Sequence, residues 1–201
     1  MNSSAGTMKA PTFRSQAVRE SSGELGLAKG EHQLPPMLIL ASTYFLNFSG
    51  LKQITVGLRP DAKFAVKIVF SHLKVPSRHV ELSVEDFEEL CKHFDLFRQV
   101  FETTETGAKT LEFKNFDVLL ESMFEKPTVT LLDKNSGAKF SFQAGIFDAL
   151  VWQESNVRTA MQTCRWLGSQ LRTLDLGKVT DQSDPLIRQA VSELKTYGCL
   201  K

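Results

Sequence analysis

The sequence predicts an α+β protein built from two tandem antiparallel β-meander-plus-helix units that form a pseudo-dimer, plus a C-terminal helix. Short runs that alternate apolar and polar residues, separated by turn residues, indicate antiparallel strands. Each set of runs is followed by an amphipathic stretch with helical spacing. Shifting the chain by 60 residues also aligns seven positions of matching chemistry, namely Val80, Leu82, Phe87, Leu90, Phe97, Arg98 and Phe101 with Phe140, Phe142, Phe147, Leu150, Val157, Arg158 and Met161. We interpret this correspondence as an internal repeat, with a chance match of two amphipathic segments as the alternative.

The first unit is predicted over residues 37–107, after an N-terminal arm over residues 1–36 whose composition is typical of disorder. Residues 37–48 form an apolar run that indicates a buried strand, and three alternating runs follow within residues 54–84. A helix is then expected from Ser83, which is placed as the N-cap with Asp86 at the third helical position. Its apolar stripe is continuous and consists of Phe87, Leu90, Cys91, Phe94, Phe97 and Phe101.

The second unit is predicted over residues 108–173 and repeats this plan. Strands are expected around Leu111, Phe116–Phe124, Val129 and Phe140, and residues 133–137 (Asp-Lys-Asn-Ser-Gly) are typical of a hairpin turn. A helix longer than the first one follows, and no strong capping residue precedes it. Residues 174–201 are expected to be a linker and a last helix, which begins at Ser183-Asp184-Pro185 and ends at Gly198.

Composition excludes collagen-like, coiled-coil and wholly disordered proteins. The chain has 201 residues, of which 42% are hydrophobic and 23% are charged, and its net charge is +1; these values are ordinary for a globular protein. The longest apolar run is too short for a membrane span, which needs about 20 residues. We therefore expect no membrane association.

The sequence offers no catalytic or cofactor motif, so we predict a protein that is not an enzyme and has no cofactor. A nucleophile elbow, a zinc-protease motif and a phosphate-binding glycine loop are all missing. Cys91 and His93 lie two residues apart on one predicted helix and would point to different faces, so they do not form a metal pair. The three cysteines cannot form a disulfide framework, and an intracellular location follows.

A cationic surface is the strongest candidate for a site. Residues 51–84 carry six Lys and Arg residues against two acids, and such an uneven field attracts polyanions. On the strand faces turned away from the helices, alternation exposes hydroxyl and cationic side chains, among them Thr128, Thr130 and Ser141. The candidate nucleic-acid-binding residues are Arg59, Lys67, Lys114 and Lys139, with Lys52 and Lys63 from the same basic segment. Phe116 and Phe124 are candidate rings for stacking on unpaired bases, and a plain solvated sheet face is the alternative.

The segment Leu82-Ser83-Val84-Glu85-Asp86-Phe87-Glu88-Glu89-Leu90 resembles the strand-to-helix junction of the transcriptional positive cofactor four family. Two such units in one chain are similar to the Whirly proteins, to the mitochondrial guide-RNA-binding proteins and, more loosely, to the Pur-alpha repeats. The resemblance covers residues 37–172 and implies four strands and a helix per unit. It also implies that single-stranded nucleic acid binds across the sheets. By position, Lys67 and Lys139 match the sheet-borne basic residues of these families, whereas Gly145-Ile146 replaces the acidic cap in the second unit.

The predicted function is non-catalytic binding of single-stranded DNA or RNA in transcription, replication or RNA metabolism. A homo-oligomer is compatible with it, and the expected location is the nucleus. The mitochondrion is the alternative location, because the first 19 residues contain Lys9, Arg14 and Arg19 and no acid. The alternative function is a protein–protein adaptor, or a viral structural or accessory protein, that does not bind nucleic acid.

Overall fold

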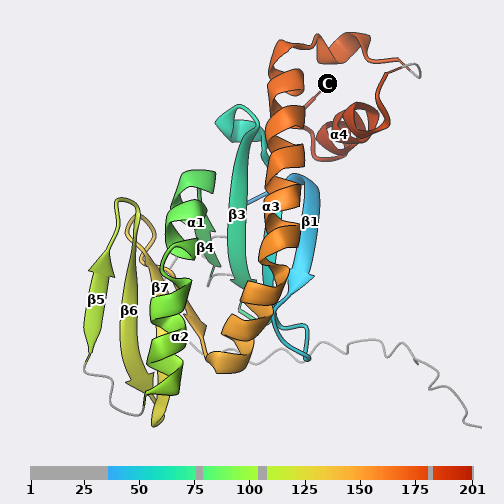
Figure 1. The fold of residues 1–201 in the computed structure, drawn as a ribbon. Coiled ribbons are helices and arrows are strands. Elements are labelled where there is room, and N and C mark those ends of the chain that lie inside the picture. Colours follow the sequence, from blue (N-terminus) through green and yellow to red (C-terminus); the bar gives the residue numbers. More distant parts are fainter. Residues whose placement is uncertain (1–35, 76–78, 104–107, 181–182, 201) are drawn as a thin grey trace, which may run out of the picture. The chain divides into compact units, whose positions relative to one another are not determined.

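Two four-stranded antiparallel sheets organise the chain, as the alternating runs predict (Figure 1). The computed structural model describes residues 36–75, 79–103, 108–180 and 183–200, so the predicted N-terminal arm lies almost wholly outside the described residues. The first sheet has the order β1-β2-β3-β4, with β1 (Ile39–Phe45), β2 (Lys52–Arg59), β3 (Ala65–His72) and β4 (His79–Leu82). The second sheet has the order β5-β6-β7-β8, with β5 (Lys109–Glu112), β6 (Phe116–Met123), β7 (Lys126–Asp133) and β8 (Lys139–Phe142).

A helix follows the last strand of each sheet after a single residue. His79 and Lys139 begin β4 and β8, and Val84 and Ala144 begin the helices α1 (Val84–Cys91) and α3 (Ala144–Thr173). Both pairs of starting residues are therefore 60 residues apart, the offset that the repeat interpretation uses. The first junction has the predicted capping box, because the Ser83 hydroxyl accepts from the Asp86 amide and the Asp86 carboxylate accepts from the Ser83 amide. Gln143, at the second junction, makes no side-chain capping bond.

The helix expected over residues 83–101 is wrong in one respect, because it is two helices. After α1 the chain turns at Lys92 and His93, and α2 (Phe94–Glu102) begins as a separate helix. The reason is tertiary packing. Phe87 of α1 lies 6.4 Å from Phe70 of the first sheet, whereas Phe94 of α2 lies 5.3 Å from Phe147 of α3. α1 and α2 thus pack their apolar side chains on different partners.

The helices do not each stay on the sheet of their own half. The long helix α3 packs mainly on β1, β2 and β3 of the first sheet, and α2 packs on β7 of the second. The aromatic rings of the two halves also meet directly, since Phe70 lies 5.4 Å from Phe140 and 5.5 Å from Phe142. The buried apolar side chains consequently form one continuous core.

The last helix, α4 (Pro185–Thr196), begins as predicted, with Asp184 as N-cap and Pro185 in the first turn. It packs against β1 and α3 through Ile187, Ala190 and Leu194. Glu193 also accepts a hydrogen bond of 2.7 Å from the backbone amide of Leu40. Leu40 has a positive φ of 51° at an irregularity in the pairing of β1 with β2, so α4 satisfies a donor at the edge of the first sheet.

Candidate functional site

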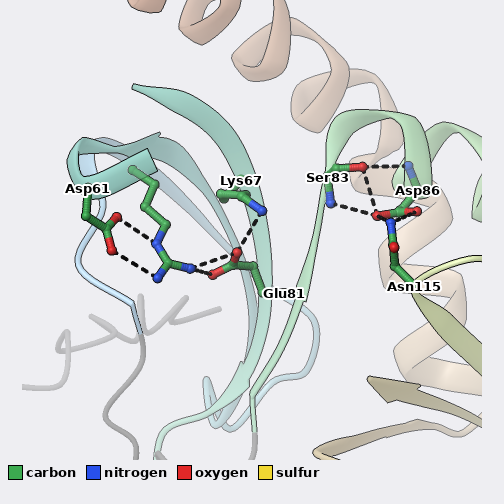
Figure 2. Close-up of polar contacts among 7 residues, drawn as sticks. Asp61, Lys67, Glu81, Ser83, Asp86 and Asn115 are labelled. Carbon is green, nitrogen blue, oxygen red and sulfur yellow. Dashed lines mark hydrogen bonds and ion pairs between the residues drawn. The ribbon is translucent and has the colours of Figure 1, made fainter. Parts of the chain in front are cut away.

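Four charged residues form a connected cluster on the first sheet, and Figure 2 shows it in close-up. Arg59 donates from Nη1 to both carboxylate oxygens of Glu81, at 2.8 and 3.0 Å. Lys67 Nζ lies 2.8 Å from Glu81 Oε1. On its other side, Arg59 binds Asp61 through Nε at 2.8 Å and Nη2 at 3.0 Å. Arg59 and Lys67, two of the six candidate cations, are thus held by carboxylates of the same chain.

Strand register explains why these side chains meet. Gly57 pairs with Lys67, and Val69 pairs with Glu81, across adjacent strands. Residues that face each other across a pair share a face, and so do residues two apart on one strand. Arg59, Lys67 and Glu81 therefore project from the same side, which is opposite the side where Leu58 contacts α3 near Gly168. We call this side of the first sheet the open face.

The cluster is electrostatically balanced. The hydrogen bond to Asp61 raises the pKa of Arg59, and the same bond lowers the pKa of Asp61. The Glu81 side chain is only 15% exposed, and those of Lys67 and Arg59 are 24% and 32% exposed. The side chains of Arg59 and Lys67 are therefore fixed in direction and partly shielded from water. Because Asp61 and Glu81 balance their charge, the cluster as a whole has no surplus positive charge.

A polar cleft of about 570 Å³ opens over this cluster. Its lining from the first half includes Arg59, Lys67, Glu81 and Asp86, and the second half contributes Asn115 and the hairpin turn with Asp133. Asn115 Nδ2 donates to both Asp86 oxygens at 3.0 Å, so the capping box of α1 is tied to the second sheet (Figure 2). Among the described residues, two Lys or Arg side chains and three carboxylates line the cleft, together with His79. The carboxylates thus outnumber the Lys and Arg side chains by one, so the cationic surface expected from residues 51–84 is not found at this cleft.

The chain itself covers part of the open face. Pro36 lines the polar cleft and also, with Leu38, a second and more apolar cleft over Thr55 and Val69. A Cβ atom on Gly57 would lie 2.9 Å from the Cβ of Leu38, so glycine permits this close crossing. Val69, on the open face, is only 3% exposed. The surface available to a ligand is therefore narrower than the whole sheet.

The other four predicted cations lie in different surroundings. Lys52 Nζ donates to the Ser141 carbonyl at 2.6 Å and lies 5.4 Å from the Phe140 ring centroid, and burial lowers its pKa. Lys52 thus joins β2 to β8. Lys63, Lys114 and Lys139 are exposed, in the turn after β2, in the turn before β6 and at the start of β8 respectively.

Three expectations about the second sheet are wrong. Phe116 is 1% exposed and stacks on Phe113 with centroids 4.5 Å apart, so its ring is closed to a nucleobase. Thr128 and Thr130 are each 1% exposed. Thr130 is used within the sheet, where its hydroxyl donates to Glu121 and lies 2.9 Å from Ser141 Oγ. Strand alternation predicts on which side of the sheet a side chain lies, but it does not predict whether neighbouring side chains cover it.

An aromatic pocket of about 560 Å³ is the feature that the sequence analysis missed. It lies between the turn after β1 and the first half of α3, and its lining includes Phe45, Phe48 and Trp152. These three side chains are largely exposed. Two sequence signals could have indicated this pocket: Phe48 ends the apolar run over residues 37–48, and Trp152 lies outside the apolar stripe of its helix.

Other kinds of site find no support in the described ranges. Residues 36–75, 79–103, 108–180 and 183–200 contain no group of three potential metal ligands. The helices within these ranges include none that is long and apolar enough to cross a membrane.

The chain matches no protein-family model, no curated protein and no solved structure.

Proposed function

We propose that this protein binds single-stranded DNA or RNA and catalyses no reaction. One observation carries the proposal: Arg59 and Lys67, on adjacent strands, converge on the two oxygens of one carboxylate. A guanidinium and an ammonium arranged around two oxygens are also suited to a phosphodiester, whose non-bridging oxygens have similar spacing and charge. Glu81 then occupies the position that a backbone phosphate takes in the complex.

Binding in this scheme is an exchange of anions. A phosphate displaces the Glu81 carboxylate, which turns toward solvent, while Asp61 continues to hold the other side of Arg59. Since Asp61 and the sheet keep Arg59 extended, little conformational entropy is lost when the phosphate binds. Lys114 and Lys139, both exposed, contribute further phosphate contacts from the second half.

The proposal extends to the arrangement of the two halves. We infer that the two sheets with their helices form a pseudo-dimer, in which both units contribute to one binding surface. The equal 60-residue offset of β4 and β8 and of α1 and α3 supports this inference. So does Asn115, which connects the second sheet to Asp86 beside the polar cleft. A role in transcription, replication or RNA metabolism, in the nucleus, belongs to the same proposal.

Glu81→Gln tests the exchange directly. Each partly exposed ion pair is worth about 0.2–1 kcal/mol, so weakening two of them should raise the affinity for a labelled single strand about 2- to 30-fold. Glu112→Gln is the matched control, because Glu112 is an exposed acid on β5 and its replacement changes the net charge equally. Fluorescence anisotropy measures both affinities. Equal affinities for the two variants would remove the exchange mechanism.

Charge reversal tests the cations themselves. Lys67→Glu and Lys139→Glu should each weaken binding while circular dichroism shows a folded protein. Lys139 is exposed, so its replacement leaves the core untouched. Unchanged affinity in both variants would show that neither lysine contacts the strand.

A protein–protein adaptor is the second candidate function. The observation that favours it is the group of exposed rings formed by Phe45, Phe48 and Trp152, which are 56%, 114% and 79% exposed. Clustered exposed apolar side chains commonly mark protein contacts. If no single strand binds even at low salt, the nucleic-acid proposal falls and the adaptor function takes its place.

A further inference from the structure

The aromatic pocket has two walls of different origin. Phe45, Leu46 and Phe48 come from the end of β1 and the turn after it, and Ile146, Ala149 and Trp152 come from one side of α3. Its volume of about 560 Å³ lies within the range of small-molecule sites. Phe48 and Trp152 are the most exposed of its rings, so the energy of burying them is still available to a ligand.

Amide groups complete the lining. Asn47, Gln143 and Gln153 all border the pocket. Gln153 Oε1 accepts from Asn156 and Asn47 Oδ1 accepts from the Lys52 amide, both within the protein. These bonds orient the two carboxamides and leave their NH₂ groups to donate elsewhere. Carboxamides are the side chains that match the mixed donors and acceptors on the edge of a nucleobase.

The charge around the pocket favours a ligand joined to phosphates. None of the described residues that line the pocket is acidic. Lys52 connects its two walls, because its backbone amide binds Asn47 and its Nζ binds the carbonyl of Ser141, two residues before Gln143. A neutral cavity of rings and amides beside a lysine complements an uncharged base that is attached to an anionic backbone.

We propose that this pocket takes an unpaired nucleobase of the bound single strand, stacked on Trp152 or Phe48 with its edge toward the amides. This inference rests on the proposed function and adds to it a site for bases, separate from the phosphate position of Arg59 and Lys67. An apolar peptide side chain is the competing occupant. It would use the rings but would make no hydrogen bonds to the three carboxamides.

Tryptophan fluorescence tests the proposal, because the chain contains two tryptophans. Trp166→Phe leaves Trp152 as the reporter inside the pocket, and Trp152→Phe leaves Trp166 on the same helix as the matched control. The probe is an oligothymidylate of about 15 nucleotides, within the site sizes of about 4–16 nucleotides that single-strand-binding OB folds cover. We expect saturable quenching in Trp166→Phe and little in Trp152→Phe. An oligonucleotide with the same phosphates but abasic sugars should not quench either variant.

Affinity gives the second readout. Stacking of one base on a ring is worth about 1–3 kcal/mol, so Trp152→Ala should weaken binding about 5- to 150-fold. Tyr197→Ala is the control, because Tyr197 is 54% exposed and lies outside the pocket lining. Both side chains are on the surface, so neither replacement should lower the thermal midpoint.

The outcomes separate the two proposals. If Trp152→Ala binds the oligonucleotide as tightly as the unchanged protein, the base pocket is overturned while the phosphate proposal stands. If the unchanged protein binds no oligonucleotide, the proposed function fails and the pocket proposal fails with it. Quenching of Trp166→Phe by an apolar peptide but by no oligonucleotide would overturn the base pocket in favour of a protein partner.

Discussion

Gly168 on α3 offers a sharp test of how this helix packs on the first sheet. A glycine inside an exposed helix is normally improved by alanine, which favours the helix by about 1 kcal/mol. At Gly168, however, an added Cβ would lie 2.6 Å from the backbone oxygen of Phe64 and 3.1 Å from a methyl group of Leu58. The oxygen belongs to the backbone between η1 (Pro60–Ala62) and β3, so it cannot turn aside as a flexible side chain would.

The expected effect of Gly168→Ala follows from these two opposing terms. Overpacking of a buried contact costs about 1–3 kcal/mol, and the gain in helix propensity offsets about 1 kcal/mol of that cost. The variant should therefore lose about 1 kcal/mol of unfolding free energy, or about 2–4 °C in Tm for a protein of this size.

Gly145→Ala is the matched comparison in the same helix. Apart from its chain neighbours and the backbone of its own helix turn, no atom of the described residues lies within 4 Å of a Cβ built on Gly145. This variant should therefore be as stable as the parent or slightly more stable. Urea denaturation followed by circular dichroism gives both free energies, and an unchanged m-value shows that the unfolded state is the same. If Gly168→Ala were at least as stable as Gly145→Ala, α3 would not approach the first sheet as described.

Two further predictions concern the thiols and the helix cap. Burial raises the pKa of Cys91 to about 12 and that of Cys164 to about 11, so both remain protonated and unreactive at pH 8. Only the exposed Cys199 should react with Ellman's reagent in the native protein, against three thiols in denaturant, and fast reaction of a second thiol would contradict the burial. Replacing Ser83 with Ala removes the side-chain half of the capping box and should cost about 1 kcal/mol in urea denaturation; no loss would mean that α1 is held by its packing alone.

The local elements could be predicted from the sequence wherever a local pattern decides them. Alternation along β2 follows from burial of Ile54, Val56 and Leu58 on one side of the strand. Ser83 and Asp184 cap their helices through bonds to residues only two or three positions away. The 60-residue offset between β4 and β8, and between α1 and α3, could also be predicted from the sequence, because it depends on spacing alone.

The break between α1 and α2 could not be read in the same way. The apolar stripe from Phe87 to Phe101 is continuous, and only the position of Phe147, more than 40 residues along the chain, shows why α2 turns toward the second half. Interactions between distant segments decided this element, and periodicity does not contain them.

The candidate site was predictable in its residues but not in its charge. Sequence alternation places Arg59, Lys67 and Glu81 on one side of the first sheet, and the structure confirms that placement. It is the register of β2, β3 and β4 that brings the single acid between the two cations. The aromatic pocket was missed because Phe48 and Trp152 belong to segments about 100 residues apart, which meet only when α3 lies across the first sheet.

The most direct test of the central claim is the affinity of a labelled single strand for the intact protein, measured by anisotropy over a range of salt concentrations. If phosphates bind Arg59 in place of the Glu81 carboxylate and bind the lysines of the proposed site, the logarithm of the affinity should fall linearly with the logarithm of the salt concentration. The slope should be about −0.7 for each phosphate bound. An affinity that does not change with salt, or no binding at low salt, would contradict the claim.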